Sequence, residues 1–353
     1  MSSESIEYPN PENISENSPQ PLIVVEDVSI SSRDSMASTV ERYPSTTHHP
    51  STPASPLQAT EPSLYSIFAP ANPDPGHHAQ HNQTRNELAN SHVGDILGAK
   101  PDGTTRIYGQ NQNGVNLREK GHQFKEICED TRLIQADLRS IIEHNLDTTN
   151  LEVRQICHDI ARQTFGHYQL ELTSSSIPFR THYKPGGTMI LAQDDITGRI
   201  LNQSSDPLGR WTYLQLAGRN GCILNFVTAY QVCPRPTNPT GTTAYHQQES
   251  LLRTQGRTDV NPRRNFRKDL TNFLKPMKNR KEHIILTGDF NEPLDSGNSN
   301  MSKICQDIGL TDVFALRHPH LPDPATYIRG STRIDYFLVS SSVLPSVTAC
   351  GYD

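Results

Sequence analysis

The sequence predicts an α+β sandwich, in which strands form packed sheets and helices lie outside them. Two observations support this fold class. From Thr104 onward, short β-branched runs alternate with helical patterns. Several of the strands follow one another through short turns, which is typical of sheets built from hairpins. Strands mixed with helices in this way pack as sheets with helices on their faces, so the elements are expected to form one layered domain.

Two strands and two helices are predicted at the start of this domain. The run TTRIYGQN begins a strand, and Lys120–Arg132 follows as a helix with its apolar side chains on one face. Leu138–Ile142 is predicted to be a buried strand that ends at Glu143. Thr149 or Asn150 is suited to cap the next helix, because short polar side chains accept hydrogen bonds from the first helical amides.

A turn, a hairpin and a long connection come next. Tyr183–Gly187 (YKPGG) is a turn that leads into the strand TMILA. The runs GRWTYLQLAG and CILNFVTAY form a β-hairpin around the turn at Asn220 and Gly221. From Cys233 to about Pro262 the chain is polar and rich in proline, and it is predicted to be a connection without regular structure.

The last predicted elements are one helix and two strands. Arg263–Leu274 carries its apolar side chains at helical spacing, so an amphipathic helix is expected there. The strand His283–Thr287 leads to the segment GDFN, which contains Asp289. STRIDYFLVSSSV is predicted as a strand entered through Asp335.

Residues 1–100 differ in composition from the rest and are predicted to be a disordered, acidic tail. They hold 12 of the 26 prolines and 12 acidic against 4 basic residues, a charge of -8 within a chain total of -6. Such a segment buries too little apolar surface to offset its ordering entropy. Pro21–Ile30 is β-prone, and both a docking peptide and a chance apolar stretch remain open. Residues 101–353 are the predicted domain.

The six cysteines are scattered and include no CxxC pair, which argues against a zinc or dithiol site. The N-terminus MSSESIEYPN lacks the basic and apolar regions of a secretory signal. Free thiols in a reducing compartment are therefore expected, with a nuclear or cytoplasmic location inside the cell. No apolar run approaches the roughly 18 residues of a membrane span, so no membrane association is expected.

Polar side chains follow the ends of several apolar strands. Glu143, Asp289, Asn291 and Tyr230 all occupy such positions, and strand ends collect in one cleft when sheets pack. Each residue alone fits a turn or a helix cap as well as a ligand. Together, carboxylate and amide oxygens are hard donors that suit Mg²⁺ or Mn²⁺. This set indicates metal-assisted hydrolysis of a phosphoester and does not identify the substrate.

Five segments carry a resemblance to a known family. They are, in chain order, RIYGQNQNG, SIIEH, NFVTAYQV, LTGDFNEP and RIDYFLVS. In these segments the chain from about residue 104 to 353 resembles the endonuclease/exonuclease/phosphatase superfamily, the DNase I-like proteins. The resemblance implies a four-layered α/β sandwich, with two mixed β-sheets flanked by helices. It also implies a Mg²⁺-dependent phosphodiester hydrolase.

The resemblance implies a role for each matched residue. Glu143 would be the principal metal ligand, with Asn111 beside it in the opening motif. Tyr230 falls in the motif that holds an active-site tyrosine. Asp289 would orient or deprotonate the attacking water, and Asn291 would hold the scissile phosphate.

Asp335 would orient a catalytic histidine, and here the sequence departs from the family. The Ser-Asp-His segment expected beyond the RIDY strand does not precede the final ACGYD. His318 and His320 come before Asp335 and are poor substitutes by order. The sequence thus predicts a domain that is incomplete at its C-terminus, with weak activity or none. Cys233 stands where relatives that act on abasic DNA commonly have Asn, which argues against that specificity.

The chain is especially similar to endonuclease domains of retroelement-type proteins in the segments YGQNQNG, EHNLD, KPGGT and GDFNEPLD. DNA is therefore the expected partner, with RNA as the alternative. Ten basic residues lie between Arg253 and Lys281. Among them Arg264, Arg267 and Lys268 belong either to a solvated helix face or to a surface that contacts a nucleic-acid backbone. Trp211 would either stack on a base or pack in the core.

Three functions remain open from the sequence. The first is a Mg²⁺-dependent DNA endonuclease of retroelement type. The second is a phosphoinositide phosphatase or a deadenylase of the same superfamily, although Glu292 and Asp295 beside GDFN disfavour a highly anionic small ligand. The third is a catalytically inactive nucleic-acid-binding remnant. The sequence does not predict the oligomeric state.

Overall fold

The structure is a computed structural model that describes residues 23–26, 93–96, 98–177, 184–236, 243–294, 299–327 and 331–352. Most of the predicted tail lies outside these residues, so the domain boundary at residue 100 stays a prediction. Within the β-prone run Pro21–Ile30, residues Ile23–Glu26 form a strand, β1. All described residues belong to one compact unit.

The first sheet has five strands in the order β1-β3-β4-β6-β5. Its further strands are β3 Arg106–Asn111, β4 Leu138–Ile142, β5 Tyr168–Thr173 and β6 Thr188–Gln193. β3 and β4 run parallel, and the remaining neighbours run antiparallel. The sheet is therefore mixed, and the ends of its two parallel strands point to one edge.

The second sheet has six strands in the order β11-β12-β10-β9-β8-β7. Its strands are β7 Ile200–Ser205, β8 Trp211–Ala217, β9 Ile223–Tyr230, β10 His283–Asp289, β11 Leu310–Asp312 and β12 Asp335–Ser340. β9 and β10 are parallel, while the other pairs are antiparallel. A separate two-stranded sheet pairs β2 Val93–Gly94 with β13 Gly351–Tyr352.

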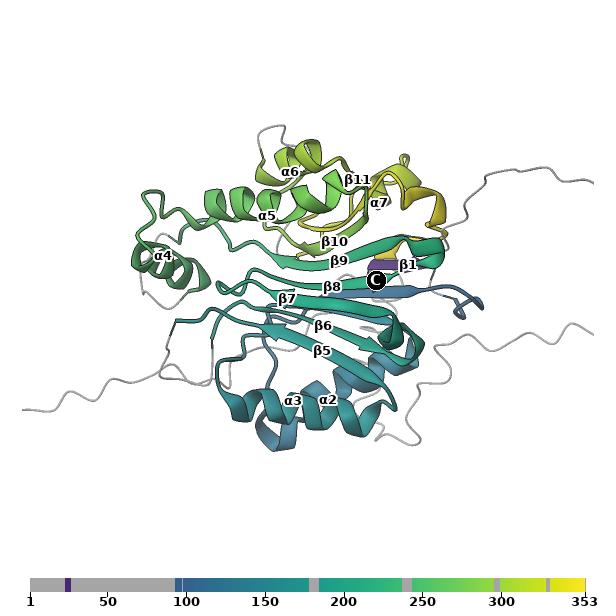
Figure 1. Ribbon diagram of the computed structural model, residues 1–353, viewed down its shortest axis with the longest axis horizontal. Coiled ribbons are helices and arrows are strands. Elements are labelled where there is room, and N and C mark those ends of the chain that lie inside the picture. Colours follow the sequence, from purple (N-terminus) through teal and green to yellow (C-terminus); the bar gives the residue numbers. More distant parts are fainter. Residues whose placement is uncertain are drawn as a thin grey trace, which may run out of the picture. The chain divides into compact units, whose positions relative to one another are not determined.

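Helices cover the outer face of each sheet, as Figure 1 shows. α2 Arg118–Leu133 and α3 Leu151–Thr164 pack on the first sheet. α5 Pro262–Asn279 and α6 Asn300–Ile308 pack on the second. The shorter helices are α4 Ala244–Thr254 and α7 Val313–Arg317, with 3₁₀ turns η3 Asp194–Arg199, η4 Arg219–Gly221 and η5 Leu344–Ser346. Among the described residues, no helix combines the length and apolar character needed to cross a membrane.

The alternation of side chains along β8 explains the layering. Leu214 and Leu216 point into the core between the two sheets, whereas Trp211 and Tyr213 point to the opposite face beneath α5. Successive side chains of a strand face opposite sides, so a central strand with apolar residues on both faces needs cover on both. The two sheets and two helical layers give the predicted four-layered sandwich.

The parallel pairing of β9 and β10 depends on one glycine. A Cβ atom at Gly288 would lie 2.0 Å from the carbonyl oxygen of Ala229 on the neighbouring strand. Only a residue without a side chain permits this close approach of the two backbones. Gly288 therefore fixes how Asp289 is presented at the end of β10.

Two sequence-based predictions about the elements were incomplete. The connection from Cys233 to Pro262 is not free of regular structure, because α4 lies within it. The helix predicted at Arg263–Leu274 continues to Asn279, with Pro276 inside it. By contrast, Asn150 caps α3 as expected, and its side chain accepts a hydrogen bond from the Glu152 amide.

Candidate active site

The ends of strands from both sheets meet at one place. Asn111 ends β3 and Asp289 ends β10, and Glu143 follows β4 directly. The Asn111 amide nitrogen Nδ2 donates to Glu143 Oε2 and to Asp289 Oδ2, each over 2.8 Å. A single amide group therefore joins a carboxylate of the first sheet to one of the second.

Tyr230 and Asp335 complete this cluster. Tyr230 ends β9 in register with Asp289, and Asp335 begins β12 opposite Asp289. The Tyr230 hydroxyl donates a hydrogen bond to Glu143 Oε1. Burial and the neighbouring Glu143 carboxylate raise the pKa of Tyr230 well above its ordinary value, so the hydroxyl remains a donor at neutral pH.

The carboxylates of the cluster repel one another. Burial first, and then the charges of Asp335 and Glu143, raise the pKa of Asp289 well above its ordinary value. Burial and Glu143 raise the pKa of Asp335 to about 7, against the lowering effect of a hydrogen bond from the Thr326 side chain. Within the described part of the chain, no ion pair joins these three carboxylates to a basic side chain.

Because these carboxylates have no basic partner, we asked whether the residues of the cluster fit a divalent cation. Among the described residues, no three His, Cys, Asp or Glu side chains form a ready metal-binding group. The oxygen donors at the cluster are the Glu143 and Asp289 carboxylates. Asn111 turns its Nδ2 toward both of them, while its Oδ1 accepts the Asn113 N–H over 2.8 Å. Oxygen donors of this kind are those that Mg²⁺ and Mn²⁺ prefer, and Mg²⁺ commonly uses only one or two carboxylates together with water and phosphate oxygens. The donor set therefore fits such an ion.

Asn291 lies beside Asp289 in a fixed orientation. Its backbone adopts a left-handed conformation (φ 49°), which Asn tolerates better than most residues. Its backbone N–H donates to Asp289 Oδ1 over 2.9 Å, and its side-chain Nδ2 donates to the Gln231 carbonyl over 2.8 Å. The Cys233 thiol donates to Asn291 Oδ1 over 3.1 Å. One N–H of the Asn291 amide has no hydrogen bond to a described residue.

Glu143 adopts a strained backbone conformation that its neighbours hold in place. Its φ is 51°, an uncommon value for a residue other than Gly, Asn or Asp. Its N–H donates to the Gly187 carbonyl over 2.9 Å, and its carbonyl accepts from the Gly114 N–H over 2.7 Å. Asn145 exchanges hydrogen bonds with Gly186 through its backbone N–H and its side-chain Oδ1. The turn YKPGG thus holds the loop that presents Glu143.

His144 lies directly behind Glu143 and is fully buried. Its ring Nε2 donates to the Thr173 carbonyl over 2.9 Å, and its Nδ1 accepts from the Leu146 N–H over 3.0 Å. Burial lowers the pKa of His144 to about 4, so the imidazole is neutral at physiological pH. A Cβ atom at Gly187 would lie 2.6 Å from this ring, which explains why glycine stands there.

The predicted partner of Asp335 is not found among the described residues. The described hydrogen bonds of Asp335 are with the hydroxyls of Thr326 and Tyr352, and no histidine is among these partners. His318 is occupied elsewhere, since its Nε2 bonds the Cys350 carbonyl at 2.8 Å and lies 3.3 Å from Asp95. His318 therefore does not serve as the missing imidazole.

The basic residues predicted to contact nucleic acid lie on α5, and the described contacts do not bring them into the carboxylate cluster. Arg264 pairs with Asp259 over 2.8 Å. Lys268 is exposed and Arg267 is half-buried. Trp211 packs against the rings of Phe266 and Phe273, so its core interpretation is confirmed and its base-stacking interpretation is wrong.

The Glu292 carboxylate, which the sequence set against a highly anionic ligand, is paired with a basic side chain. Its carboxylate binds Arg263 over 2.6 Å and accepts the Met301 N–H over 2.7 Å. Asp295, the second acidic residue in that interpretation, lies outside the described residues. Arg263 also donates to the Val232 carbonyl over 2.6 Å, which fastens the start of α5 to the segment after Tyr230.

Comparisons with known proteins identify a family model that matches the chain. A sequence model of the Endonuclease/Exonuclease/phosphatase family matches residues 134–353, which include Glu143, Asp289 and Asp335. No curated protein sequence matches the chain significantly. An AP endonuclease, LMAP from Leishmania major, is 14% identical with a TM-score of 0.48, covering 70% of this chain and 86% of its own. The 3'-5' exonuclease NExo from Neisseria meningitidis is 16% identical with a TM-score of 0.43, covering 70% and 98%.

Proposed function

The chain belongs to the endonuclease/exonuclease/phosphatase family, and from this premise we propose that it hydrolyses phosphodiester bonds of DNA with a divalent cation, Mg²⁺ or Mn²⁺. The observation that carries the proposal is the amide bridge from Asn111 to Glu143 and Asp289. It gathers hard oxygen donors from both sheets at one point. Mutually repelling carboxylates without a basic partner are suited to a cation and poorly suited to any other role.

Glu143 and Asn111 would hold the cation, and Tyr230 keeps the Glu143 carboxylate in position through its hydroxyl. When bound, the cation polarises the phosphoryl group and neutralises the charge that develops during hydrolysis. Tyr230 donates to Oε1 and Asn111 to Oε2, so both oxygens of Glu143 have a fixed orientation. Such preorganisation avoids rearrangement at the moment of reaction.

Asp289 and Asn291 would act on water and phosphate. Both oxygens of Asp289 already accept hydrogen bonds, from the Asn291 N–H and from Asn111. This leaves the carboxylate rigidly aimed, as a group that orients or deprotonates an attacking water must be. The free N–H of the Asn291 amide would donate to a non-bridging oxygen of the scissile phosphate.

Among the described residues, Asp335 lacks the histidine partner that the matching aspartate has in relatives, so the rate of hydrolysis is expected to differ from theirs. The described residues supply Thr326 and no imidazole. We therefore expect slow hydrolysis, since the loss of one member of a cooperating set lowers rates by orders of magnitude. A nucleic-acid-binding protein without activity is the limiting case of this expectation.

The finer identity rests on the motifs alone. We propose an endonuclease of retroelement type, because four segments resemble the endonuclease domains of such proteins. They are YGQNQNG, EHNLD, KPGGT and GDFNEPLD. We also propose a nuclear or cytoplasmic location. All six cysteines are free, which suits a reducing compartment. Cell fractionation with a tagged full chain tests the location.

The test of the function is a nicking assay on supercoiled plasmid DNA with the purified full chain. We expect slow, Mg²⁺-dependent nicking that stops in EDTA and falls at least about 100-fold in Asp289→Asn. Asp159→Asn is the matched control, since Asp159 lies on α3, pairs with Arg162 and belongs neither to the cluster nor to its neighbouring loops. Activity that persists in Asp289→Asn overturns the proposal. Phosphate release from a phosphoinositide, without nicking, would support the phosphatase alternative instead.

A further inference from the structure

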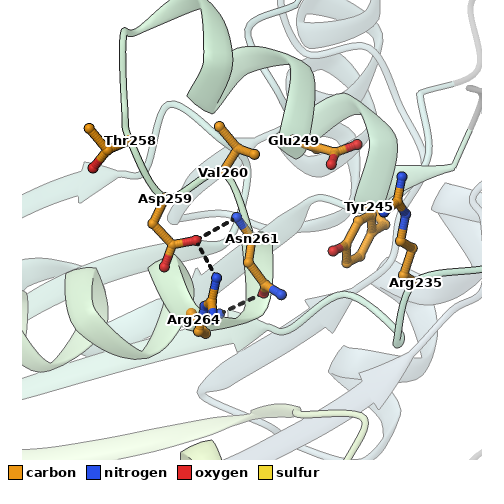
Figure 2. A pocket seen from close by; sticks show the side chains of 8 residues that line it. All are labelled: Arg235, Tyr245, Glu249, Thr258, Asp259, Val260, Asn261 and Arg264. Atoms are coloured by element: carbon orange, nitrogen blue, oxygen red, sulfur yellow. Dashed lines mark hydrogen bonds and ion pairs between the residues drawn. The ribbon is translucent and has the colours of Figure 1, made fainter.

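A groove with a volume of about 520 Å³ lies at the N-terminal end of α5, outside the cluster of strand ends. Its lining comes from the segment after β9, the first half of α4 and the turn that enters α5 (Figure 2). The residues that matter most are Arg235, Tyr245, Asn261 and Arg264. None of them belongs to the candidate catalytic set.

The groove begins next to the candidate active site. Arg235 follows Cys233 by two residues, a separation of at most about 7 Å along the chain, and the Cys233 thiol contacts Asn291. Tyr245 packs in the same apolar cluster as Tyr230. A ligand that is longer than one phosphate can therefore reach from Asn291 into the groove.

The lining offers donors that are not used up by other contacts. Tyr245 is 6% exposed, yet the described residues give its hydroxyl no hydrogen-bond partner, and it lines the groove. Figure 2 places Arg235 beside this ring. Arg235 is exposed and has no ion pair with a described residue. A hydroxyl at the wall of a groove that no described residue engages is available to donate a hydrogen bond to a ligand.

The lining holds two arginines and two acidic residues, and each acidic residue is paired with an arginine. Glu249 faces Arg253 at 3.6 Å, and Asp259 pairs with Arg264 at 2.8 Å. Both arginines are largely exposed, so these pairs contribute little and can exchange partners. The 18-residue helix α5 adds the partial positive charge of its N-terminus, where Asn261 is the cap.

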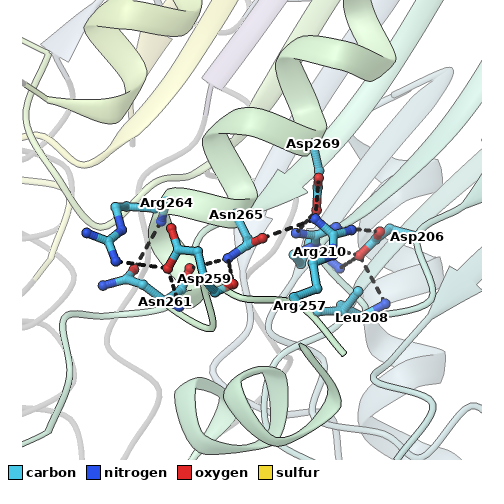
Figure 3. A network of polar contacts seen from close by, with 9 residues as sticks. All are labelled: Asp206, Leu208, Arg210, Arg257, Asp259, Asn261, Arg264, Asn265 and Asp269. Atoms are coloured by element: carbon cyan, nitrogen blue, oxygen red, sulfur yellow. Dashed lines mark hydrogen bonds and ion pairs between the residues drawn. The ribbon is translucent and has the colours of Figure 1, made fainter. Parts of the chain in front are cut away.

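The wall of the groove is held in place by a polar network, drawn in Figure 3. The Asn265 amide donates to the Asp259 and Asn261 carbonyls over 2.7 and 2.9 Å. Arg257 joins Asn265 to Asp269, and Asp269 in turn binds the buried Arg210 of the second sheet over 3.0 Å. A groove that is fixed before a ligand arrives loses less entropy when it binds one.

We propose that this groove is a second phosphate subsite, which binds a phosphate of the DNA strand next to the one that is cleaved. Arg235 and the Tyr245 hydroxyl contact that phosphate, and Arg264 exchanges Asp259 for it. The inference rests on the proposed function, because a flanking phosphate exists only if the substrate is a polynucleotide.

The test measures DNA binding by fluorescence anisotropy with the full chain in EDTA, where no cleavage occurs. The variants are Arg235→Ala and Tyr245→Phe, and the matched control is Arg280→Ala. Arg280 is an exposed arginine at the opposite end of α5, about 27 Å away along the helix. For Arg235→Ala we expect about tenfold weaker binding and a salt slope lowered by about one. For Tyr245→Phe we expect about fivefold weaker binding from one lost hydrogen bond.

A short ligand separates the subsite from the cleavage site. A dinucleoside monophosphate carries no flanking phosphate, so wild type and Arg235→Ala should bind it equally. Inorganic phosphate should compete with the duplex more strongly for wild type than for Arg235→Ala, and equal competition for the two proteins would overturn the assignment. Equal effects of Arg235→Ala and Arg280→Ala on duplex binding would also overturn it.

The outcome is distinguishable from failure of the proposed function. Nicking without any effect of Arg235→Ala on duplex binding leaves the hydrolase and removes the subsite. Binding that depends on Arg235 and Tyr245 without nicking leaves the subsite on a protein that binds DNA and does not cut it.

Discussion

Replacement of Tyr230 by Phe removes one hydrogen bond from the candidate active site and little else. The ring is 3% exposed and packs against Ile142, Val232 and Ala244, contacts that Phe preserves. The lost group is the hydroxyl that donates to Glu143 Oε1. Because burial and Glu143 hold the pKa of Tyr230 above its ordinary value, the hydroxyl is a donor throughout the neutral range.

The expected size of the effect follows from that bond. A hydrogen bond to a charged group contributes about 1.5–3 kcal/mol. Glu143 is half-buried, so water can replace part of the contact and the lower end applies. About 1.4 kcal/mol corresponds to a factor of ten in rate. Tyr230→Phe should therefore lower kcat/KM for DNA nicking about 10- to 30-fold, with a weaker apparent affinity for Mg²⁺.

The assay is the nicking rate as a function of Mg²⁺ concentration, together with the thermal unfolding midpoint. Tyr213→Phe is the control. The Tyr213 hydroxyl is also buried, and it donates to Asn225 Oδ1 over 2.8 Å between β8 and β9, away from the cluster. We expect the control to lose stability and keep its rate. A Tyr230→Phe rate within twofold of wild type at every Mg²⁺ concentration would refute the role given to this hydroxyl.

Three further predictions concern stability. Arg210→Met leaves the buried Asp206 unpaired and should cost about 3–5 kcal/mol, or roughly 6–20 °C in Tm, with partial recovery in the double variant with Asp206→Asn. His144 has a pKa of about 4 in the folded state, against an ordinary value of 6.5. Between these two pH values the folded state binds fewer protons than the unfolded state. The free energy of unfolding should therefore fall by roughly 3 kcal/mol as the pH falls through this window. In His144→Gln, urea titrations at pH 4–7 should lack this component. Gly288→Ala places a Cβ 2.0 Å from the Ala229 carbonyl and should destabilise by about 4 kcal/mol or more, visible as lost cooperativity in thermal unfolding.

The sequence was informative where strands are apolar and end in polar residues. Glu143, Tyr230 and Asp289 were predicted at strand ends and Asn111 from the family resemblance, and the structure brings all four into hydrogen-bond contact. Their chemical roles remain predictions. Hydropathy located the first three because the central strands before them are covered on both faces and are therefore rich in apolar residues.

The elements that were missed lack such a pattern. α4 buries Tyr245, Gln247 and Gln248, so polar side chains occupy its inner face and no apolar stripe appears in the sequence. β7 is an exposed edge strand with the sequence ILNQSS, and alternation of hydropathy is absent from it. Burial of polar groups depends on partners elsewhere in the fold, which a local pattern does not contain.

The supporting contacts of the site were invisible for a related reason. Asn145 and Lys184 are far apart in the sequence, yet the Lys184 N–H donates to the Asn145 carbonyl over 2.9 Å. The buried Lys184 side chain also pairs with Asp147 over 2.8 Å. The consecutive glycines of YKPGG were the available signal. They predicted a turn, and only the packed structure shows that this turn holds Glu143 in its strained conformation.

The account depends most on the claim that the Glu143 carboxylate holds a divalent cation at the cluster of strand ends. Isothermal titration of Mn²⁺ into the full chain tests it without DNA and without activity. We expect one site in wild type, its loss in Glu143→Gln, and unchanged binding in Glu282→Gln, whose carboxylate pairs with Arg280. Equal Mn²⁺ binding by wild type and Glu143→Gln would contradict the claim.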